Sequence, residues 1–323
     1  MAGLESGNIS GISGISPHMK LRTVLATLLL TAVPLGGQPA AAATPVTIAY
    51  AQRTQTWELV LTDGRVVKVP EALAVAPRDT ISEGAPATFL ISGDGRHFFY
   101  FRKSDGRFTE RTLHGKERAI RDITVDTVGE EWPSSVSYDG SFVLTETSAP
   151  GLGALLDLRK GKSLPLPGKM ATWGFAGFSP DGERLLLQGG EDGRMTVFDR
   201  RLRTCLRSKT RLWATALAND YVTAAEPVGS WPKSRTLRLV DLRTGKASGT
   251  VTVRLPRGQR IDDLDFDKAG HLVVRSKTTT GVTVYRVSKT TGAVTPLRTM
   301  VRPDVKVWVL PGDDEYEPWA EKK

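Results

Sequence analysis

The sequence predicts an all-β fold, specifically a six-bladed β-propeller, and three observations support this. An Asp-Gly dipeptide precedes a short apolar run three times, at Asp94, Asp139 and Asp181. These positions lie 45 and 42 residues apart, a period typical of propeller blades. From Val46 onward, short alternating or apolar runs are separated by Gly, Asp and Pro turns without a stretch of helical period.

The first 43 residues are expected to form an N-terminal extension followed by a secretory signal peptide. Lys20 and Arg22 precede an apolar stretch over residues 24–35, which is shorter than the roughly 20 residues that a spanning helix needs. Ala41 and Ala43 fit the small-residue pattern of a cleavage site. We therefore expect cleavage after Ala43, no transmembrane span, and a secreted or extracytoplasmic protein that is soluble after cleavage.

A single propeller domain is expected over residues 44–323. Within it, each repeat reads as an inner strand ending in the Asp-Gly turn, a second strand, a third strand ending in an acidic residue, and an outer strand after a tight turn. Five complete repeats are found, over residues 87–121, 134–167, 171–209, 212–253 and 261–297.

The sixth blade is predicted to combine both ends of the chain. Residues 46–50, 57–61 and 66–69 supply three strands, and residues 305–310 supply the fourth. A closed ring leaves no open edge between its first and last blades, which favours this arrangement.

The run Phe178-Ser-Pro-Asp-Gly182, followed by three leucines from Leu185, resembles the signature of TolB-like propeller repeats, which are also described as WD-repeat-like. Residues 137–140 and 92–95 match this signature in part, whereas residues 219–220 and 267–270 depart from it. The resemblance spans almost the whole of residues 44–323. It implies an exported six-bladed propeller that acts as a protein-binding scaffold, as in the Tol envelope system.

Basic residues concentrate on one predicted outer strand of a chain whose formal net charge is +9. Alternation with period two places six side chains on one side of residues 201–211: Arg201, Arg203, Cys205, Arg207, Lys209 and Arg211. One interpretation is that these charges prevent edge-to-edge strand pairing. The alternative is an electrostatic patch for an anionic envelope polymer or lipid headgroups. We expect no nucleic-acid partner, because no aromatic residues alternate with the basic ones as stacking platforms.

Five tryptophans divide into two groups by their expected position. Trp173, Trp213 and Trp308 fall on predicted inner strands, where packing between blades explains them. Trp132 and Trp231, each followed by proline, are expected in loops. Loop aromatics on a propeller face serve as anchors for a peptide or sugar, or fold back over the blade ends.

Asp263 and Asp265 are candidates to line the central channel. They alternate with Leu264 and Phe266 on a predicted inner strand. A calcium loop would require a glycine and a distal glutamate at fixed spacing, and the sequence lacks both. We find no local sequence motif of a hydrolase, a zinc site or a phosphate-binding loop, and we expect no catalytic residue, metal or cofactor.

These features favour an exported, non-enzymatic propeller scaffold that binds a protein or peptide partner. Two alternatives remain open at this stage. One is a propeller enzyme, such as a lyase or lactonase, that uses channel carboxylates. The other is a binder of anionic polymers or glycans that uses the basic strand and the loop tryptophans.

Overall fold

The computed structural model describes residues 45–78, 83–84, 87–125, 131–147, 151–167, 170, 173–189, 192–229 and 234–312. The chain divides into two compact units, Met1–Thr44 and Pro45–Lys323, and every described residue belongs to the second. The expected signal peptide and its cleavage site at Ala41 and Ala43 lie outside the described residues. In the described part of the chain, we find no helix with the length and hydropathy of a membrane span.

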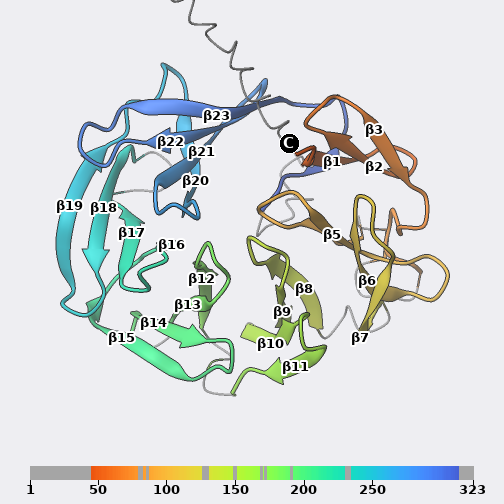
Figure 1. Cartoon of the computed structure of the whole chain (residues 1–323), viewed down its shortest axis with the longest axis horizontal. Helices are drawn as coiled ribbons and strands as arrows, with labels where there is room; N and C mark the ends of the chain where they lie inside the picture. Colours follow the sequence, from red (N-terminus) through yellow and green to blue (C-terminus); the bar gives the residue numbers. More distant parts are fainter. Residues whose placement is uncertain are drawn as a thin grey trace, which may run out of the picture. The chain divides into compact units, whose positions relative to one another are not determined.

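Six four-stranded antiparallel sheets surround a common centre in the second unit (Figure 1). Five of them are formed by consecutive strands, as the repeats predict. Blade 1 contains β4 (Phe89–Ile91), β5 (His97–Phe101), β6 (Arg107–Thr112) and β7 (Arg118–Thr124). Blade 2 contains β8 (Glu131–Val136), β9 (Phe142–Thr147), β10 (Gly151–Asp157) and β11 (Lys162–Pro165).

The next three blades follow the same order from the centre outward. Blade 3 contains β12 (Gly174–Phe178), β13 (Arg184–Gln188), β14 (Arg194–Asp199) and β15 (Thr204–Arg211). Blade 4 contains β16 (Ala216–Leu217), β17 (Thr223–Pro227), β18 (Thr236–Asp241) and β19 (Lys246–Thr252). Blade 5 contains β20 (Arg260–Phe266), β21 (Leu272–Thr278), β22 (Gly281–Val287) and β23 (Val294–Val301).

The sixth sheet, the closing blade, joins the two ends of the propeller and confirms the predicted closure. Its order is β24 (Val307–Val309), β1 (Ile48–Arg53), β2 (Trp57–Leu61) and β3 (Val66–Val69). Ala51 on β1 lies opposite Val309 on β24 in an antiparallel pairing. The first and last described strands therefore belong to one sheet.

The Asp-Gly turns share one hydrogen-bonding pattern, which explains their recurrence. In three blades a buried serine two positions before the aspartate donates its hydroxyl to that carboxylate, over 2.7 Å for Ser92 and Asp94. The serine oxygen also accepts the amide that opens the next strand, as Ser92 does from His97 at 3.0 Å. The following glycine has a positive φ, +66° at Gly95, which side-chain-bearing residues rarely adopt.

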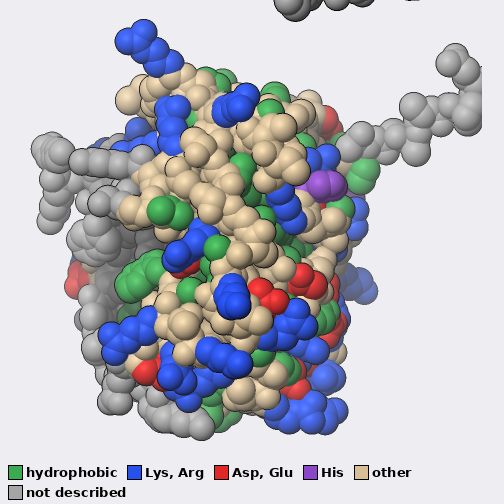
Figure 2. All heavy atoms as spheres, turned by 90° about the vertical axis from the view of Figure 1, so that its left-hand side faces the viewer, with side chains coloured by type: hydrophobic (Ala, Val, Ile, Leu, Met, Phe, Trp, Pro, Cys, Tyr) green, Lys and Arg blue, Asp and Glu red, His purple; other side chains and the backbone are tan. Residues whose placement is uncertain are grey.

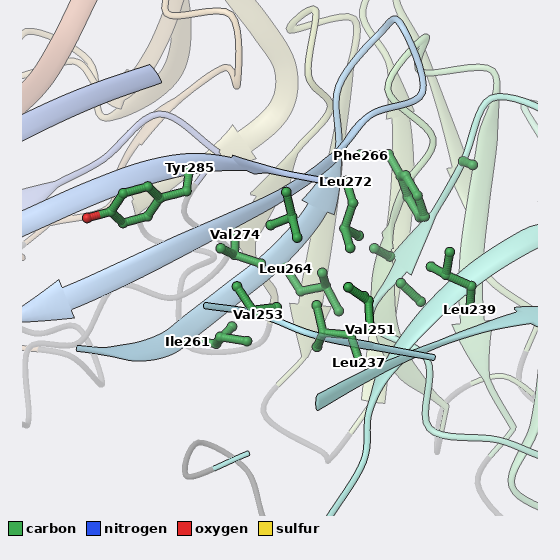
Figure 3. Packing of buried hydrophobic residues seen from close by; sticks show 14 of the residues in the cluster. Leu237, Leu239, Val251, Val253, Ile261, Leu264, Phe266, Leu272, Val274 and Tyr285 are labelled. Atoms are coloured by element: carbon green, nitrogen blue, oxygen red, sulfur yellow. The ribbon is translucent and has the colours of Figure 1, made fainter. Parts of the chain in front are cut away.

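The core lies between neighbouring blades. The largest cluster fills the space between blades 4 and 5, where Leu237 and Val251 from one blade face Ile261 and Leu264 from the next (Figure 3). Similar clusters fill the spaces between blades 1 and 2, 2 and 3, and 3 and 4. Because each sheet buries both faces in this way, the blades form a rigid frame for the turns and loops at their ends.

Alternating strand direction divides these connections between two faces of the propeller. The turn face carries the turns from the first to the second strand and from the third to the fourth strand of each blade. The loop face carries the turns from the second to the third strand and the connections from each outer strand to the next blade.

Candidate functional site

The central channel is lined by residues from all six blades. Around a space of about 50 Å³ lie Gly93, Val136, Tyr138, Gly177, Phe178, Thr215, Asp263, Leu264, Asp265 and Gly312. A glycine from each of blades 1 and 3 contributes to this lining, and a Cβ at Gly93 would lie 2.7 Å from Cδ2 of Tyr138. The backbone and the Tyr138 ring thus approach closely at the axis, and the remaining space is narrow.

Asp263 and Asp265 both line this channel. Each carboxylate accepts the amide of its next residue, at 2.7 Å from Leu264 to Asp263 and at 2.6 Å from Phe266 to Asp265. Oδ2 of Asp263 lies 3.6 Å from Nη2 of Arg275, which also donates to the carbonyl of Pro311 at 3.0 Å. The β20–β21 pairing contains a bulge between Ile261 and Asp263. At this point the side chains of β20 no longer alternate regularly between the two faces of the sheet.

The turn-face side of the axis carries a contact between opposite blades. Nζ of Lys268, in the turn after β20, lies 5.0 Å from the ring centroid of Tyr138, in the turn after β8. The Tyr138 carbonyl also accepts the amide of Asp94 at 2.9 Å. Burial raises the pKa of the Tyr138 hydroxyl. Among the described residues, no group of three or more His, Cys, Asp or Glu is arranged to hold a metal ion.

The basic residues of blade 3 lie on an exposed surface at its outer strand. Arg207 and Lys209 belong to β15, whereas Arg201 and Arg203 lie in the turn that precedes it. Figure 2 shows the side of the propeller that carries β15 and β19, with Lys and Arg side chains gathered over its lower half. We call Arg201, Arg203, Arg207, Lys209 and Arg211 the basic strand; all five are exposed.

Two of these five cations are already paired within their own blade. Arg203 forms an ion pair with Asp199 at 2.6 Å, and Arg207 forms one with Asp192. Arg201, Lys209 and Arg211 form no ion pair with a described residue. The positive charge that remains for an external anion is therefore concentrated on these three side chains.

The tryptophans are placed differently from the prediction in two cases. Trp132 lies within the inner strand β8, opposite Glu146, and not in a loop. An inner strand has a free edge, so the following Pro133 is tolerated there, next to a bulge. Trp231 lies outside the described residues. Trp308 packs edge-on against Tyr50 with ring centroids 5.8 Å apart, and Trp173 lies 5.8 Å from Phe198, as expected for packing residues.

Trp213 was predicted to lie on an inner strand and to pack between blades. This prediction is wrong, because 68% of the surface of Trp213 is exposed. The inner strand of blade 4 is only two residues long, Ala216–Leu217, so Trp213 falls in the connection before it. Its amide donates to Oε2 of Glu226 at 3.1 Å, and this buried carboxylate is also bound by Arg238 Nε at 2.6 Å. The backbone of Trp213 is thus fixed while its ring faces solvent.

Further apolar side chains are exposed on the loop face. Val228 follows Glu226 by two residues and is 42% exposed. Val75, in the connection from the closing blade to blade 1, and Val301, at the end of β23, are 46% and 75% exposed. An exposed aromatic ring on a fixed backbone, as at Trp213, is typical of an interaction surface.

A second cavity lies between blades 1 and 2 on the turn face. Its volume is about 500 Å³, and it is lined by His97, Glu110, Arg111, Thr112, Lys116, Arg118, Asp139, Gly140, Ser141, Leu158 and Arg159. We call it the interblade pocket. His97, Glu110 and Arg118 belong to no local sequence motif that would have revealed the pocket.

Glu110 is the buried centre of this pocket. Its side chain is 11% exposed, and it accepts hydrogen bonds from Nε of Arg118 at 2.8 Å and pairs with Nδ1 of His97 at 2.9 Å. Burial by itself would raise the pKa of Glu110, but the bonds from His97 and Arg118 lower it below its usual value. The hydrogen bond to Glu110 raises the pKa of His97, against the opposing effect of burial.

Comparisons with known proteins found similar chains only among solved structures. No family model and no curated protein matches the chain. Among solved structures, the chain is similar to TolB from Acinetobacter baumannii, with 17% identity and a TM-score of 0.45 over 81% of this chain and 65% of that one. It thus spans less than two thirds of the TolB chain.

Two enzymes are also among the similar structures. An oligogalacturonate lyase in complex with manganese is 13% identical, with a TM-score of 0.42 over 82% of this chain and 77% of that one. Dipeptidyl peptidase 4 from Porphyromonas gingivalis is 13% identical, with a TM-score of 0.40 over 68% of this chain and 40% of that one. The assignment of the six-bladed propeller rests on the sheet topology described above, and no activity is transferred from these structures.

Proposed function

We propose that this chain is an exported, non-enzymatic propeller scaffold that binds a protein or peptide partner through its loop face. The proposal rests mainly on Trp213, which is 68% exposed and whose amide donates to the buried carboxylate of Glu226. Tryptophan is enriched among residues that dominate binding energy, because one ring buries a large area at little cost in conformational entropy. A pre-positioned Trp213 therefore supports an interface.

The dimensions of the channel support a scaffold over a channel enzyme. A space of about 50 Å³ holds a few water molecules. Pockets for drug-sized ligands commonly measure about 300–1,000 Å³. Asp263 and Asp265 are also engaged by backbone amides, which holds both carboxylates against β20.

Export is proposed from the sequence of residues 1–43, in which an apolar stretch precedes Ala41 and Ala43. Expression of the full chain in a secreting host, followed by mass measurement of the product, tests this. A product that begins at Thr44 supports export, and an uncleaved chain retained in the cytoplasm contradicts it.

The partner is tested by affinity capture from an envelope fraction. The bait is the chain from Thr44 onward, compared with Trp213→Ala and with Leu297→Ala as a matched control on the outer strand β23, where Leu297 is 46% exposed. A protein retained by the wild type and by Leu297→Ala, and lost with Trp213→Ala, supports the proposal. If the two variants retain the same proteins in the same amounts, the loop face around Trp213 is not the binding surface.

A second candidate function is binding of an anionic envelope polymer, and the basic strand favours it. Arg201, Lys209 and Arg211 are exposed and form no ion pair with a described residue. Cations of this kind bind polyanions with an affinity that falls steeply with added salt. The basic strand lies along the outer strand of blade 3 and Trp213 lies in the connection to blade 4, so the two functions are tested by different substitutions.

A further inference from the structure

The interblade pocket combines the size of a ligand site with a surplus of positive charge. Its volume of about 500 Å³ falls within the range of small-molecule sites. Four cationic side chains line it, namely Arg111, Lys116, Arg118 and Arg159, against the two carboxylates of Glu110 and Asp139. Arg111 is paired with Glu71, which lies outside the lining. The other three cations still exceed the two carboxylates before His97 is counted.

Both carboxylates are already engaged within the protein. Glu110 is bound by Arg118 and His97. Asp139 accepts the hydroxyl and the amide of Ser141, at 2.7 and 3.0 Å, and forms an ion pair with Arg159. Neither carboxylate is left as a free negative group to repel an anion at short range.

The cations retain capacity to bind a ligand. Lys116 is exposed and forms no ion pair with a described residue. The side chains of Arg118 and Arg159 are 50% and 49% exposed. Arg118 also donates from Nη1 to the carbonyl of Leu158 at 2.6 Å, which fixes its guanidinium between blade 1 and blade 2. An arginine held in this way is oriented for an incoming carboxylate or phosphate without further loss of side-chain freedom.

His97 lies at the wall between the two blades. Gly140 packs against its ring: a Cβ at Gly140 would lie 2.8 Å from Cγ of His97, so only glycine permits this approach. Nδ1 of His97 faces Glu110, whereas Nε2 has no hydrogen-bond partner among the described residues. Both ring nitrogens donate when histidine is protonated, so Nε2 is then an additional donor for an anion.

We propose that the interblade pocket binds a small ligand through its carboxylate or phosphate groups, held by Lys116, Arg118 and His97. This site lies on the turn face and is separate from the loop face proposed to bind a protein partner. No covalent step is involved, since the site supplies only donors and positive charge.

Binding is expected to strengthen as His97 becomes protonated. The charged groups that face His97 are Glu110 on β6, Asp94 and Asp139 in the two Asp-Gly turns, and, through Glu110, Arg118 on β7. Hydrogen bonding and charge from Glu110, followed by Asp94 and Asp139, raise the pKa of His97 above its usual value of 6.5. Affinity for an anion is therefore expected to fall as the pH rises through this raised pKa.

The test is calorimetric titration of the protein with inorganic phosphate and, separately, with citrate, at pH 6 and at pH 8.5. The two probes distinguish phosphate from carboxylate recognition. The variant Lys116→Glu is compared with Lys103→Glu, which places the same charge change on an exposed turn of blade 1 at the loop face. A second variant, Arg159→Gln, removes a pocket cation from blade 2.

Saturable binding of one probe, weakened about 10-fold or more by Lys116→Glu, unchanged by Lys103→Glu and weaker at pH 8.5, is the expected result. Arg159→Gln is also expected to weaken binding, but by a smaller factor, because Arg159 forms an ion pair with Asp139 and so contributes less of its charge to the ligand. The proposal is overturned if neither probe binds saturably at either pH, or if Lys103→Glu weakens binding as much as Lys116→Glu.

Discussion

The hydroxyl of Tyr221 in blade 4 donates a hydrogen bond to Oδ2 of Asp181 in blade 3. Tyr221 occupies the position that glycine holds in the inner turns of four other blades, and it adopts the same left-handed backbone, with φ of +59° compared with +70° at Gly182. A tyrosine is unfavourable in this conformation. The hydrogen bond to Asp181, and the stacking of Arg184 over the ring at 4.5 Å, offset that cost.

Replacement of Tyr221 tests this compensation. Tyr221→Phe removes the hydrogen bond and keeps the strained backbone, so we expect a loss of about 0.5–1 kcal/mol in the free energy of unfolding, with the lower end reflecting partial exposure of the pair. Tyr221→Gly removes the backbone strain as well as the hydrogen bond. Its free energy of unfolding is therefore expected to be closer to that of the wild type than the free energy of unfolding of Tyr221→Ala. Chemical denaturation of the wild type and of Tyr221→Phe, Tyr221→Gly and Tyr221→Ala measures these differences in the free energy of unfolding. Equal stability of wild type and Tyr221→Phe would show that the hydrogen bond contributes nothing.

Closure of the ring by β24 gives a second prediction. Val309 and Leu310 are 3% and 4% exposed, and their removal also uncovers the edge of β1. A chain that stops after Lys306 is expected to lose on the order of 5 kcal/mol of stability, because each fully buried Val or Leu contributes about 1.5–3 kcal/mol. For a domain of this size, that corresponds to a decrease in Tm of roughly 10 °C or more.

The control for this prediction is a chain that stops after Gly312, which retains β24. Thermal unfolding followed by circular dichroism compares the two truncations. If both unfold at the same temperature, β24 does not close the propeller.

The His97–Glu110 pair predicts how stability depends on pH. The pKa of His97 is raised in the folded protein, so its contribution is present below about 6.5 and is lost as the pH rises through the raised value. The pKa of Glu110 is lowered, so its contribution is present above about 4.5 and is lost as the pH falls through the lowered value. The pair therefore stabilises the fold most between these limits.

Tm measured from pH 5 to pH 9 tests this dependence. The wild type is expected to lose stability relative to His97→Gln as the pH rises above 6.5 and through the raised pKa of His97. The glutamine keeps a neutral hydrogen-bonding group beside Glu110. His114→Gln, at an exposed turn, is the control and should follow the wild type. Parallel curves for wild type and His97→Gln would be inconsistent with a histidine charged by Glu110.

The basic strand gives a prediction that separates its paired cations from the others. Arg203 and Arg207 have carboxylate partners in blade 3, whereas Lys209 and Arg211 form no ion pair with a described residue. We expect Lys209→Ala with Arg211→Ala to lower the salt concentration that elutes the protein from a heparin column by more than Arg203→Ala with Arg207→Ala does. The reverse order would indicate that the internal ion pairs open on binding.

The repeat made the architecture predictable from the sequence, since Asp94, Asp139 and Asp181 mark inner turns that the structure places at equivalent positions. Closure of the ring by a strand within residues 305–310 was predictable as well, because an unpaired strand edge in the closing blade needs a partner. Alternation alone does not explain which residues of β20 line the channel, because Asp263, Leu264 and Asp265 are consecutive and all three line it, next to a bulge in the β20–β21 pairing.

The site residues that were missed depend on contacts distant in sequence. Trp213 was assigned to an inner strand because periodicity does not reveal that β16 is only two residues long. The interblade pocket brings His97, Glu110 and Arg118 from blade 1 next to Arg159 from blade 2. No spacing rule relates these positions, since their proximity results from the packing of one blade against the next.

The affinity of the purified protein for a captured partner tests the central claim most directly. Calorimetric titration with wild type, Trp213→Ala and Leu297→Ala gives the required comparison. Burial of Trp213 at the centre of an interface predicts a loss of about 2 kcal/mol, or roughly 30-fold in Kd, for Trp213→Ala, with Leu297→Ala unchanged. A Kd for Trp213→Ala equal to that of the wild type would contradict binding through the loop face.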